Sequence, residues 1–339
     1  IDLAHLTVAQ FGNSVADLFG AFRARPPPPD GPRGLQAEIF DGRDFRRERR
    51  KVERTDPGIA FDFGTNAPPG SGAGAAEFSV RWRGSVVAAD TGDHEFRLRT
   101  GNGARLWING EAKPVVDAWV SSGGEVQEHR ATVRLLAGRA HPIRVDVFKF
   151  KDRTASIALE WKPPHGAWAP VPADALRTAT APEVTVVATP FPPDDGSLGY
   201  ERGTGVSKAW DEAVTRAAVE VATHIAARAD ALAGTRANAP DRVARLRAFC
   251  GRFAARAFRR PLDEAETATV VGAAFDGAPD PEAAVRRAVI RTIKSPWFLY
   301  PELSVARDPG RRTASRLALA LWDSLPDDDL LRDRKSTRL

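Results

Sequence analysis

Hydrophobic and polar side chains alternate along residues 78–111 of the 339-residue chain. The hydrophobic positions in this alternation are Phe78, Val80, Trp82, Phe96, Leu98, Leu106 and Ile108. A period of two is the pattern of a β-strand with one buried face. Residues 91–93 (TGD) and 109–110 (NG) tolerate the backbone angles of tight turns. The stretch therefore predicts antiparallel strands of a β-sandwich, with a two-residue hairpin turn at 109–110 that leads to Val115 and Val116.

Four further strand-like runs flank this stretch. They are GLQAEIFDG (34–42), IAFDFG (59–64), ATVRLLAGRAHPIRVDVF (131–148) and ASIALEWKPP (155–164). In order and spacing, these segments resemble the PA14 domain, a β-sandwich of extracellular proteins, toxins, adhesins and glycosidases that often binds glycans. The resemblance covers about residues 34–178, and FSVRWRG, GARLWING and LLAGRAHPIRV are among its most specific matches. It implies an antiparallel β-sandwich over this part of the chain.

The same resemblance raises the question of calcium. In the glycan-binding members, two neighbouring aspartates precede the Leu-aromatic hairpin strand and hold a calcium ion that takes sugar hydroxyls. This chain has Gly101 and Asn102 at that place. Calcium needs several oxygen ligands, preferably anionic ones, and an amide beside glycines replaces two carboxylates poorly. We therefore expect no cofactor, with calcium kept as the alternative that these residues serve less well.

A metal-free site is the second way in which this domain could bind a polysaccharide or another glycan. Its candidate residues are Asn102, Arg105, Trp107, Asp117 and Trp119. An indole face can stack on a sugar ring, and amide or carboxylate groups can bind its hydroxyls. The alternative is a packing role, in which Trp107 and Trp119 pack the rim of the sandwich and Asp117 caps a turn.

Outside the sandwich, hydrophobic residues recur every three or four positions, which is the helical period. Residues 7–19 follow this period, with Thr7 as N-cap and Gly20 as the C-terminal stop. Further helical stretches run from 207 to about 232, from the N-cap Asp241 to Pro261, from Asp263 onward, and from Asp280 to Lys294. We therefore expect a multidomain β plus α protein, in which the sandwich is followed by an α-helical domain.

The helical part carries a second resemblance, to the bacterial domain-of-unknown-function 1592 and 1595 group of planctomycetes and myxobacteria. The matching words are RAFRRPLDEAE (256–266), IKSPWFLYPEL (293–303) and SRLALALWDSLPDDDLL (315–331), and LTVAQFGNSVADLFG (6–20) is similar to the end of the family's upstream domain. Some members also join a cytochrome-c-like domain, which implies a place outside the cytoplasm. The resemblance supplies no catalytic residues.

These patterns predict six segments in the chain. They are an upstream-domain helix (1–22), a Pro-rich linker (23–33), the PA14-like sandwich (34–178), a second linker (179–205), a 1595-like helical domain (206–303) and the truncated start of a 1592-like helical domain (304–339). The chain starts at Ile1 and contains no methionine. We therefore expect an interior piece of a longer protein, and we assign no role to its last six residues, RKSTRL.

Composition agrees with soluble domains of ordinary size. The chain is 42% hydrophobic and 27% charged, and its apolar runs are far shorter than the roughly 20 residues that cross a bilayer. We expect no membrane span in this fragment and an extracytoplasmic location, whether periplasmic, cell-surface or secreted. The single cysteine, Cys250, excludes an intrachain disulfide, a cysteine metal cluster and a CxxCH haem attachment. Its neighbours Phe249 and Phe253 predict a packed, unreactive thiol.

No catalytic constellation is visible in the sequence. The six histidines form no HExxH or HxH pair. Asp194-Asp195 could serve as a general acid and base, although a solvated turn is the commoner role of such a pair. Asp327-Asp328-Asp329 more simply begins a helix, where carboxylates meet the helix dipole. The glycine-rich stretch 196–205 lacks the spacing of phosphate-binding loops.

Arginines concentrate between residues 242 and 260. Arg245, Arg252, Arg256 and Arg259 recur at helical spacing, as expected for a face that meets an anionic polymer. The net charge of the chain is only +5, however, and no nucleic-acid-binding motif accompanies the stripe. A solvated or interdomain face is therefore favoured, and no nucleic-acid partner is expected.

The sequence thus predicts a carbohydrate-binding module within a large extracytoplasmic bacterial protein, next to helical domains of unknown activity. The expected partners are a polysaccharide or glycan and the neighbouring domains of the same polypeptide. Two alternatives stay open. The sandwich could be a structural scaffold that binds no glycan, or an accessory part of an extracytoplasmic enzyme or redox protein whose catalytic domain lies outside this fragment.

Overall fold

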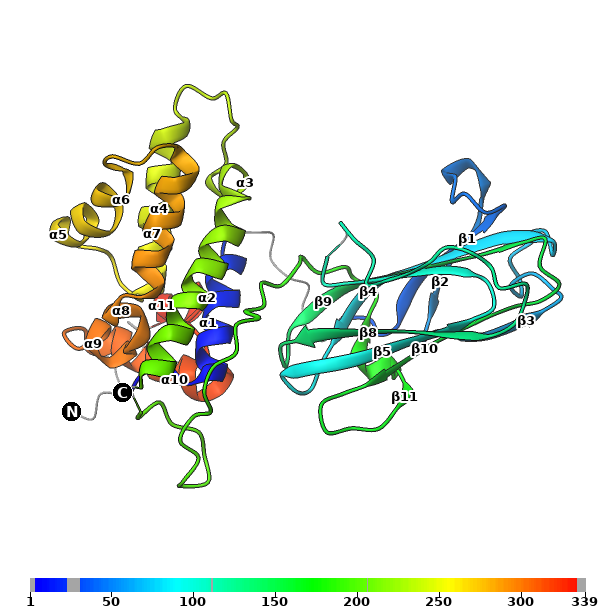
Figure 1. Cartoon of the computed structure of the whole chain (residues 1–339), viewed down its shortest axis with the longest axis horizontal. Helices are drawn as coiled ribbons and strands as arrows, with labels where there is room; N and C mark the ends of the chain where they lie inside the picture. Colours follow the sequence, from blue (N-terminus) through cyan, green and yellow to red (C-terminus); the bar gives the residue numbers. More distant parts are fainter. Residues whose placement is uncertain (1–3, 23–30, 111, 206, 334–339) are drawn as a thin grey trace. The chain divides into compact units, whose positions relative to one another are not determined.

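The computed structural model describes residues 4–22, 31–110, 112–205 and 207–333 (Figure 1). The chain divides into two compact units. One, the helical unit, joins residues 1–23 to residues 185–339, and the other, the sandwich unit, consists of residues 24–184. Most of the predicted Pro-rich linker and the predicted tail at 334–339 lie outside the described residues.

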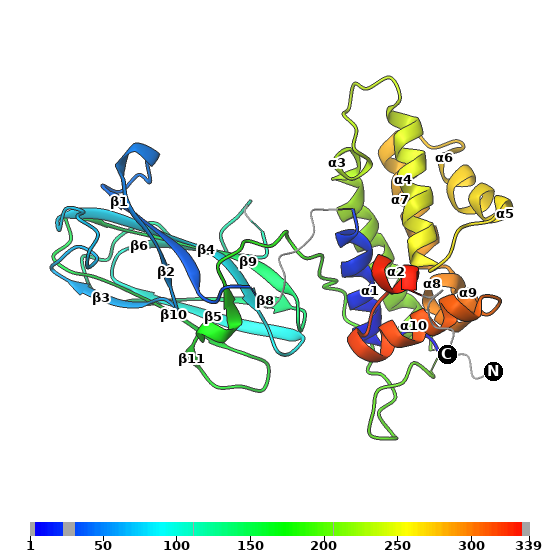
Figure 2. The same cartoon turned by 180° about the vertical axis from the view of Figure 1, so that it is seen from behind.

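The sandwich unit consists of two antiparallel sheets (Figures 1 and 2). The larger sheet has the order β2 (Arg50–Asp56), β1 (Leu35–Asp41), β4 (Glu77–Val87), β9 (Ala140–Phe150), β6 (Gly103–Ile108), β7 (Val116–Ala118), with β12 (Leu176–Arg177) paired to β4. The smaller sheet has the order β11 (Ala169–Pro170), β10 (Ala155–Lys162), β5 (Gly92–Thr100), β8 (Gln127–Leu135), with β3 (Ala60–Gly64) paired to β10. Two 3-10 helices, η1 (Arg47–Arg49) and η2 (Ala173–Ala175), complete the unit. The predicted β-sandwich is confirmed.

The alternation in the sequence directs one side of each strand into the core. The hydrophobic positions of β4, β5 and β6 are buried, and Trp82 is fully enclosed. Its indole Nε1 donates a hydrogen bond to Asp56 Oδ2 at 2.8 Å, so the one polar atom of the ring is satisfied within the core. Asp56 comes from β2, in the same sheet.

The hairpin after β6 differs from the predicted two-residue turn. Leu106 on β6 pairs with Val116 on β7, so the connection is several residues long. Asn109 has a φ of 55°, as a tight turn requires, but its side chain binds both the carbonyl and the amide of Val184 at 2.8 Å. Asn109 therefore anchors the chain segment that leaves the sandwich, and this longer loop carries β7 to the sheet edge.

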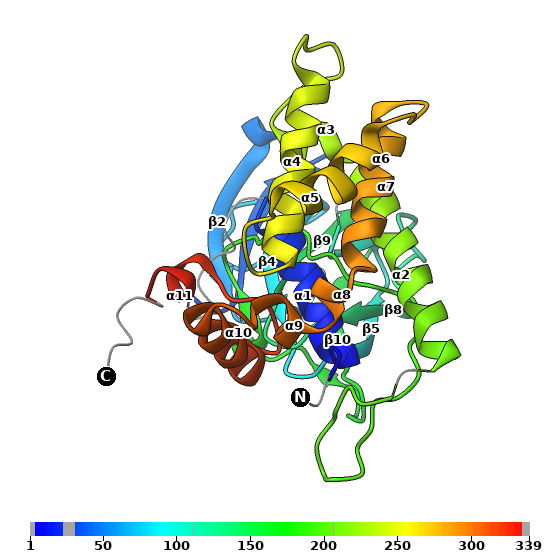
Figure 3. The same cartoon turned by 90° about the vertical axis from the view of Figure 1, so that its left-hand side faces the viewer.

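The helical unit contains α1 (Val8–Gly20), α2 (Lys208–Ala226), α3 (Ala229–Ala233), α4 (Arg242–Ala257), α5 (Glu264–Glu266), the π-helix η3 (Thr267–Gly272), α6 (Ala273–Phe275), α7 (Pro281–Ile293), α8 (Pro296–Leu299), α9 (Pro301–Val305), α10 (Pro309–Trp322) and α11 (Asp328–Asp333) (Figure 3). The predicted N-caps Thr7, Asp263 and Asp280 accept hydrogen bonds from their first turns. Asp241 does not, because its carboxylate binds Arg245 instead. Among the described residues, no helix is long and apolar enough to span a membrane.

Helix α1 shares one hydrophobic core with the later helices, which differs from its predicted place in an upstream domain. Phe11 packs against Phe298 of α8, with ring centroids 5.7 Å apart. Phe19 lies 5.1 Å from His224 of α2, and the two helices run side by side in Figures 1 and 2. Leu325, from the predicted start of a further domain, belongs to the same core. Apolar complementarity thus joins three segments that the sequence pattern separates.

Part of the predicted linker at 179–205 is also tied to this unit. Glu220 on α2 accepts hydrogen bonds from the amides of Ala188 and Thr189 at 2.7 and 3.0 Å. Cys250 is buried in the core, and burial raises the pKa of its thiol to about 12. A thiol that stays protonated is a poor nucleophile, which agrees with the predicted packing role.

Candidate functional site

The outer face of the larger sheet carries a row of alternating charges. The row consists of Glu38, Arg81, Asp146, Arg105 and Asp117, which are register neighbours on β1, β4, β9, β6 and β7. Arg81 binds Asp146 with two hydrogen bonds of 2.8 and 2.7 Å. Arg144 also binds both oxygens of Asp146. Burial opposes ionisation of Asp146, but the hydrogen bonds from Arg81 and Arg144 outweigh it and keep the pKa of this carboxyl below its ordinary value.

Aromatic rings lie under three of the arginines of this face. The guanidinium carbon of Arg144 is 4.2 Å from the centre of the Trp107 ring. The corresponding distance is 4.2 Å from Arg81 to Phe45 and 4.5 Å from Arg105 to Trp119. Each pairing has the geometry of a cation–π interaction. The outer face therefore carries aromatic rings and guanidinium groups side by side. Some of these groups are enclosed by their partners within the face, and others are exposed to solvent.

The exposed part gathers around Trp119, and we call it the Trp119 patch. It consists of Phe45, Arg105, Asp117 and Trp119. Arg105 Nε donates to Asp117 Oδ1 at 2.8 Å, and these two side chains are 33% and 51% exposed. The Trp119 ring rests on Phe148 at 4.7 Å and lies 6.0 Å from Phe45. Three of the five predicted site residues thus come together on one surface.

Gly103 makes room for the base of this patch. A Cβ atom at Gly103 would lie 2.1 Å from Cε1 of Phe148, its register partner on β9. The Phe148 ring therefore lies directly over the glycine backbone, as a side chain there would not allow. This close approach supports Phe148, which in turn supports Trp119.

The other two predicted site residues lie elsewhere. Asn102 is 3% exposed, and its amide binds Asp152 Oδ2, the carbonyl of Thr154 and the amide of Ser156 at 3.0 to 3.1 Å. All of these partners are within the chain, so Asn102 closes the loop between β9 and β10. Trp107 is 8% exposed and its ring lies beneath Arg144. Neither side chain is accessible to a ligand. Both are enclosed by residues that are distant in the sequence, so the local sequence does not reveal these contacts.

The side chains at the position of the family's calcium ion are joined to one another by hydrogen bonds. The carboxylate of Asp152 lies beside Asn102, and it accepts hydrogen bonds from Asn102 Nδ2 and, at 2.7 Å, from the Ser121 hydroxyl. The carbonyl of Gly101 accepts from the hydroxyls of Ser121 and Ser122. Hydrogen-bond donors thus point at the oxygens that a calcium ion would need.

Two features of the sandwich surface were not predicted from the sequence. The run RDFRRERRK (43–51) adds exposed arginines beside the patch, and Arg43 lies 4.2 Å above the Phe150 ring. On the outer face of the smaller sheet, Trp168 lies 4.5 Å from Arg97 and 5.4 Å from Arg130. The density of arginine in 43–51 was the available signal for the first feature. The second depends on strand pairing alone.

The acidic and basic clusters of the helical unit are used within the protein. Asp194 accepts a hydrogen bond from the amide of Val8 at 2.7 Å, whereas Asp195 binds Arg202 at 2.6 Å. The two carboxylates therefore serve different partners instead of sharing a proton. Asp327 accepts from the amide of Leu330 at the start of α11, in agreement with the helix start predicted there.

The predicted arginine stripe is not continuous. Arg259 is 2% exposed, with a φ of 60° beyond the end of α4, so it is not part of an outer helical face. Burial lowers the pKa of its guanidinium to about 9. Arg245 and Arg256 pair with Asp241 and Asp328 at 2.7 and 2.8 Å. These contacts are those of a helix surface that packs and pairs within its own unit.

Known protein families match most of the sandwich unit and part of the helical unit. Residues 31–175 match the PA14 domain, and residues 245–301 match a protein of unknown function, DUF1595. The chain is 34% identical over 128 residues to the anti-sigma-I factor RsgI3 of Acetivibrio thermocellus, covering 38% of this chain and 19% of that protein. It is 30% identical over 117 residues to a β-glucosidase of Rhizobium radiobacter, covering 33% of this chain and 14% of the enzyme.

Two solved structures that resemble the chain each cover less than half of it. An anti-sigma factor domain-containing protein has 30% sequence identity and a TM-score of 0.40, over 45% of this chain and 50% of that one. A PA14 sugar-binding domain from an RTX adhesin has 13% identity and a TM-score of 0.36, over 43% of this chain and 99% of that one. The chain spans less than a fifth of the length of its curated relatives.

Proposed function

We propose that the sandwich unit is a carbohydrate-binding module of a larger extracytoplasmic bacterial protein and that glycans bind at the Trp119 patch. The observation that carries this proposal is the exposed Arg105–Asp117 pair beside a supported indole ring. The PA14 match and the β-glucosidase relative, whose name indicates action on a sugar, support it. An extracytoplasmic place is part of the proposal, because polysaccharides are met outside the cell.

The patch offers the three groups that a sugar ring needs. The apolar face of a pyranose can stack on Trp119, while Arg105 and Asp117 supply hydrogen-bond donors and acceptors for its hydroxyls. Arg105 now lies over the indole, and an incoming sugar has to slide it aside. Moving Arg105 off the ring gives up an exposed cation–π contact, worth about 0.5–1 kcal/mol, and at most an exposed ion pair, worth about 0.2–1 kcal/mol.

The proposed binding needs no calcium. The oxygens near Gly101 and Asn102 already accept hydrogen bonds from side chains of the chain itself. The recognition groups of the Trp119 patch come from β6, from β7 and the residue that follows it, and from the β1–β2 loop, and the proposed contacts involve no metal ion. A chelator should therefore leave binding intact.

The scaffold alternative has one observation in its favour. The Arg81–Asp146–Arg144 cluster and the covered Trp107 make much of the outer face self-sufficient. In that alternative the Trp119 patch is a further set of contacts among side chains of the same face, and the sandwich supports the function of other domains of the polypeptide. An accessory role in a larger enzyme or redox protein is compatible with glycan binding and with a scaffold role.

A glycan-array screen of the full chain separates these functions. We expect binding both with calcium and with a chelator, lost in Trp119→Ala and weakened in Arg105→Gln. The matched control is Trp168→Ala, which removes an arginine-stacked indole from the other sheet and should keep binding. Binding that disappears on chelation would contradict the metal-free site. No binding in either condition would favour the scaffold.

A further inference from the structure

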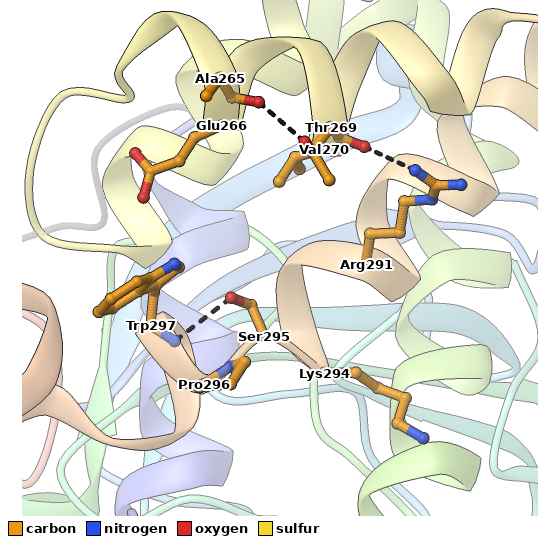
Figure 4. A pocket seen from close by; sticks show the side chains of 9 residues that line it. All are labelled: Ala265, Glu266, Thr269, Val270, Arg291, Lys294, Ser295, Pro296 and Trp297. Atoms are coloured by element: carbon orange, nitrogen blue, oxygen red, sulfur yellow. Dashed lines mark hydrogen bonds between the residues drawn. The ribbon is translucent and has the colours of Figure 1, made fainter.

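The helical unit contains a pocket of about 460 Å³ with one aromatic wall (Figure 4). Its lining residues are Ala265, Glu266, Thr269, Val270, Arg291, Lys294, Ser295, Pro296 and Trp297. They come from α5 and the π-helix η3 on one side and from the end of α7 and the start of α8 on the other. A volume in the range of roughly 300–1,000 Å³ suits a small molecule. All nine residues lie within the part that matches the protein of unknown function.

The Trp297 ring is partly exposed and lies against Arg260. The ring belongs to a residue that is 36% exposed, in the second position of α8 after the N-cap Ser295 and Pro296. The amide of Trp297 binds Ser295 Oγ at 3.2 Å, a contact drawn in Figure 4. Arg260 lies 5.2 Å from the ring centre and completes the support. A large apolar ring at a pocket rim offers a surface on which a flat ligand can stack.

Arg260 is itself locked. It makes two hydrogen bonds to Glu266, of 2.7 and 2.5 Å, and a third to the carbonyl of Ser304 at 2.9 Å. The hydrogen bonds from Arg260 also keep the pKa of Glu266 below its ordinary value. The only carboxylate of the pocket lining therefore stays ionised and is neutralised by its partner, which leaves it little attraction for a cationic ligand.

Arg291 contributes a positive charge to the pocket lining. Its Nη1 donates to the carbonyl of Thr269 at 2.6 Å, on the π-helix across the pocket. Among the described residues, no carboxylate lies within ion-pair distance of Arg291. Lys294 differs, because its Nζ binds Thr215 on α2 at 2.7 Å and points away from Trp297 in Figure 4. The π-helix matters here, since such irregular turns are frequent at functional sites.

We propose that this pocket binds a small ring-bearing carboxylic acid, with the ring against Trp297 and the carboxylate on Arg291. Arginine suits a carboxylate because its planar group can donate two parallel hydrogen bonds. A neutral ring would leave the Arg291 charge without a counter-ion. A cation would be repelled by Arg291 and only weakly attracted by Glu266, whose charge Arg260 neutralises. The proposal concerns the helical unit alone and does not rest on glycan binding by the sandwich.

Fluorine NMR of the full chain with 4-fluorobenzoate tests this proposal, with 4-fluorobenzamide as its neutral isostere. We expect broadening and shift of the benzoate signal and at least about tenfold weaker binding of the benzamide, since a hydrogen bond to a charged group gives that discrimination. Arg291→Gln should remove the preference for benzoate. Trp297→Ala should remove binding of both probes. Arg286→Gln, an exposed arginine on the same helix α7, is the matched control and should change nothing.

Three outcomes would overturn the proposal. Equal binding of the two probes would mean that the pocket does not select an anion. Retention of the benzoate preference in Arg291→Gln would place the anion elsewhere. No broadening of either probe at millimolar concentration would mean that the pocket takes no ligand of this class. Far-ultraviolet circular dichroism of each variant separates lost binding from lost folding.

Discussion

Two tryptophans of the same sheet face have opposite roles at the level of single residues. Trp107 is enclosed beneath Arg144, whereas Trp119 is half-buried and borders exposed polar groups. Trp107 lies on β6, and Trp119 directly follows β7, which pairs with β6. Their difference follows from register, which places Arg144 directly opposite Trp107.

Stability should separate these two tryptophans. Trp107→Ala should lower the free energy of unfolding of the sandwich by several kcal/mol, about 3–5 as for other buried aromatic residues. Trp82→Ala should cost at least as much, because that ring is fully buried and binds Asp56. Trp119→Ala should cost clearly less. Urea unfolding of the full-chain variants measures all three, and equal losses would show that Trp119 is also a core residue.

The sequence could predict which residues are hydrophobic partners in the strands but not which polar groups enclose them. The period of two placed Phe78, Val80 and Trp82 in the core correctly. Asn102 was expected at a binding rim, yet its partners include Asp152, fifty residues away in the chain. Only the paired strands bring these two together. Arg259 likewise left the predicted stripe because α4 ends before it.

At the level of elements, the register of β6 and β9 fixes the Trp119 patch. Gly103 and Phe148 are partners in this register, and Phe148 supports Trp119. A substitution at the glycine therefore acts on the patch from below without touching any group that meets a ligand.

Gly103→Ala should weaken glycan binding for this reason. The added methyl group overlaps the Phe148 ring, so the ring has to move and the sandwich should lose about 1–3 kcal/mol of stability, as overpacked sites do. Denaturation and array binding of the variant measure both effects. The control is Gly110→Ala, where a Cβ atom meets nothing within 4 Å and neither property should change. Unchanged binding in Gly103→Ala would separate the patch from its support.

The strand ends of the sandwich also make its stability depend on pH. His141, at the start of β9, is buried and accepts a hydrogen bond from the amide of Leu136. Burial is the main cause that lowers the pKa of His141 to about 4 and also lowers that of His94 on β5. The unfolded chain binds protons to these histidines near pH 6.5, where the folded chain does not.

Stability should therefore be complete above about pH 6.5 and fall as the pH drops towards about 4, with His141 contributing about 3 kcal/mol to the loss. Urea unfolding at a series of pH values measures the slope. His141→Gln should flatten it, because glutamine keeps an acceptor but cannot be protonated in this range. The same slope in wild type and variant would mean that other groups control acid sensitivity.

On the scale of the whole molecule, the two units unite segments that are distant in sequence. The sandwich unit lies in the chain between α1 and α2, yet these two helices share one core. The sequence predicted each helix well, from caps and periodicity. It could not predict that α1 packs with the later helices. An amphipathic pattern shows that a helix has a buried face but does not show which element covers that face.

Phe11→Ala tests this arrangement. Phe11 is buried in the core of the helical unit, so its loss should destabilise that unit by about 3–5 kcal/mol. The sandwich has a separate core and should unfold as before. Hydrogen exchange followed by mass spectrometry resolves the two units in one experiment. Unchanged protection of α2 and α4 would contradict the shared core, and the surface variant Val243→Ala is the control.

The separation of the cores also keeps the two proposed sites independent. The Trp119 patch belongs to the sandwich unit, and the Trp297 pocket belongs to the helical unit. Trp119→Ala should leave fluorobenzoate binding unchanged, and Trp297→Ala should leave glycan binding unchanged. Each variant is thus the specificity control for the other site.

The central claim is that the sandwich binds a glycan at the Trp119 patch without calcium. Calorimetric titration of the strongest array ligand into the full chain, in the presence of a chelator, tests it most directly. The predicted result is saturable binding by the wild type and a loss of at least about tenfold in Trp119→Ala, which is about 1.4 kcal/mol. Equal affinities of the two proteins, or wild-type binding that requires calcium, would contradict it.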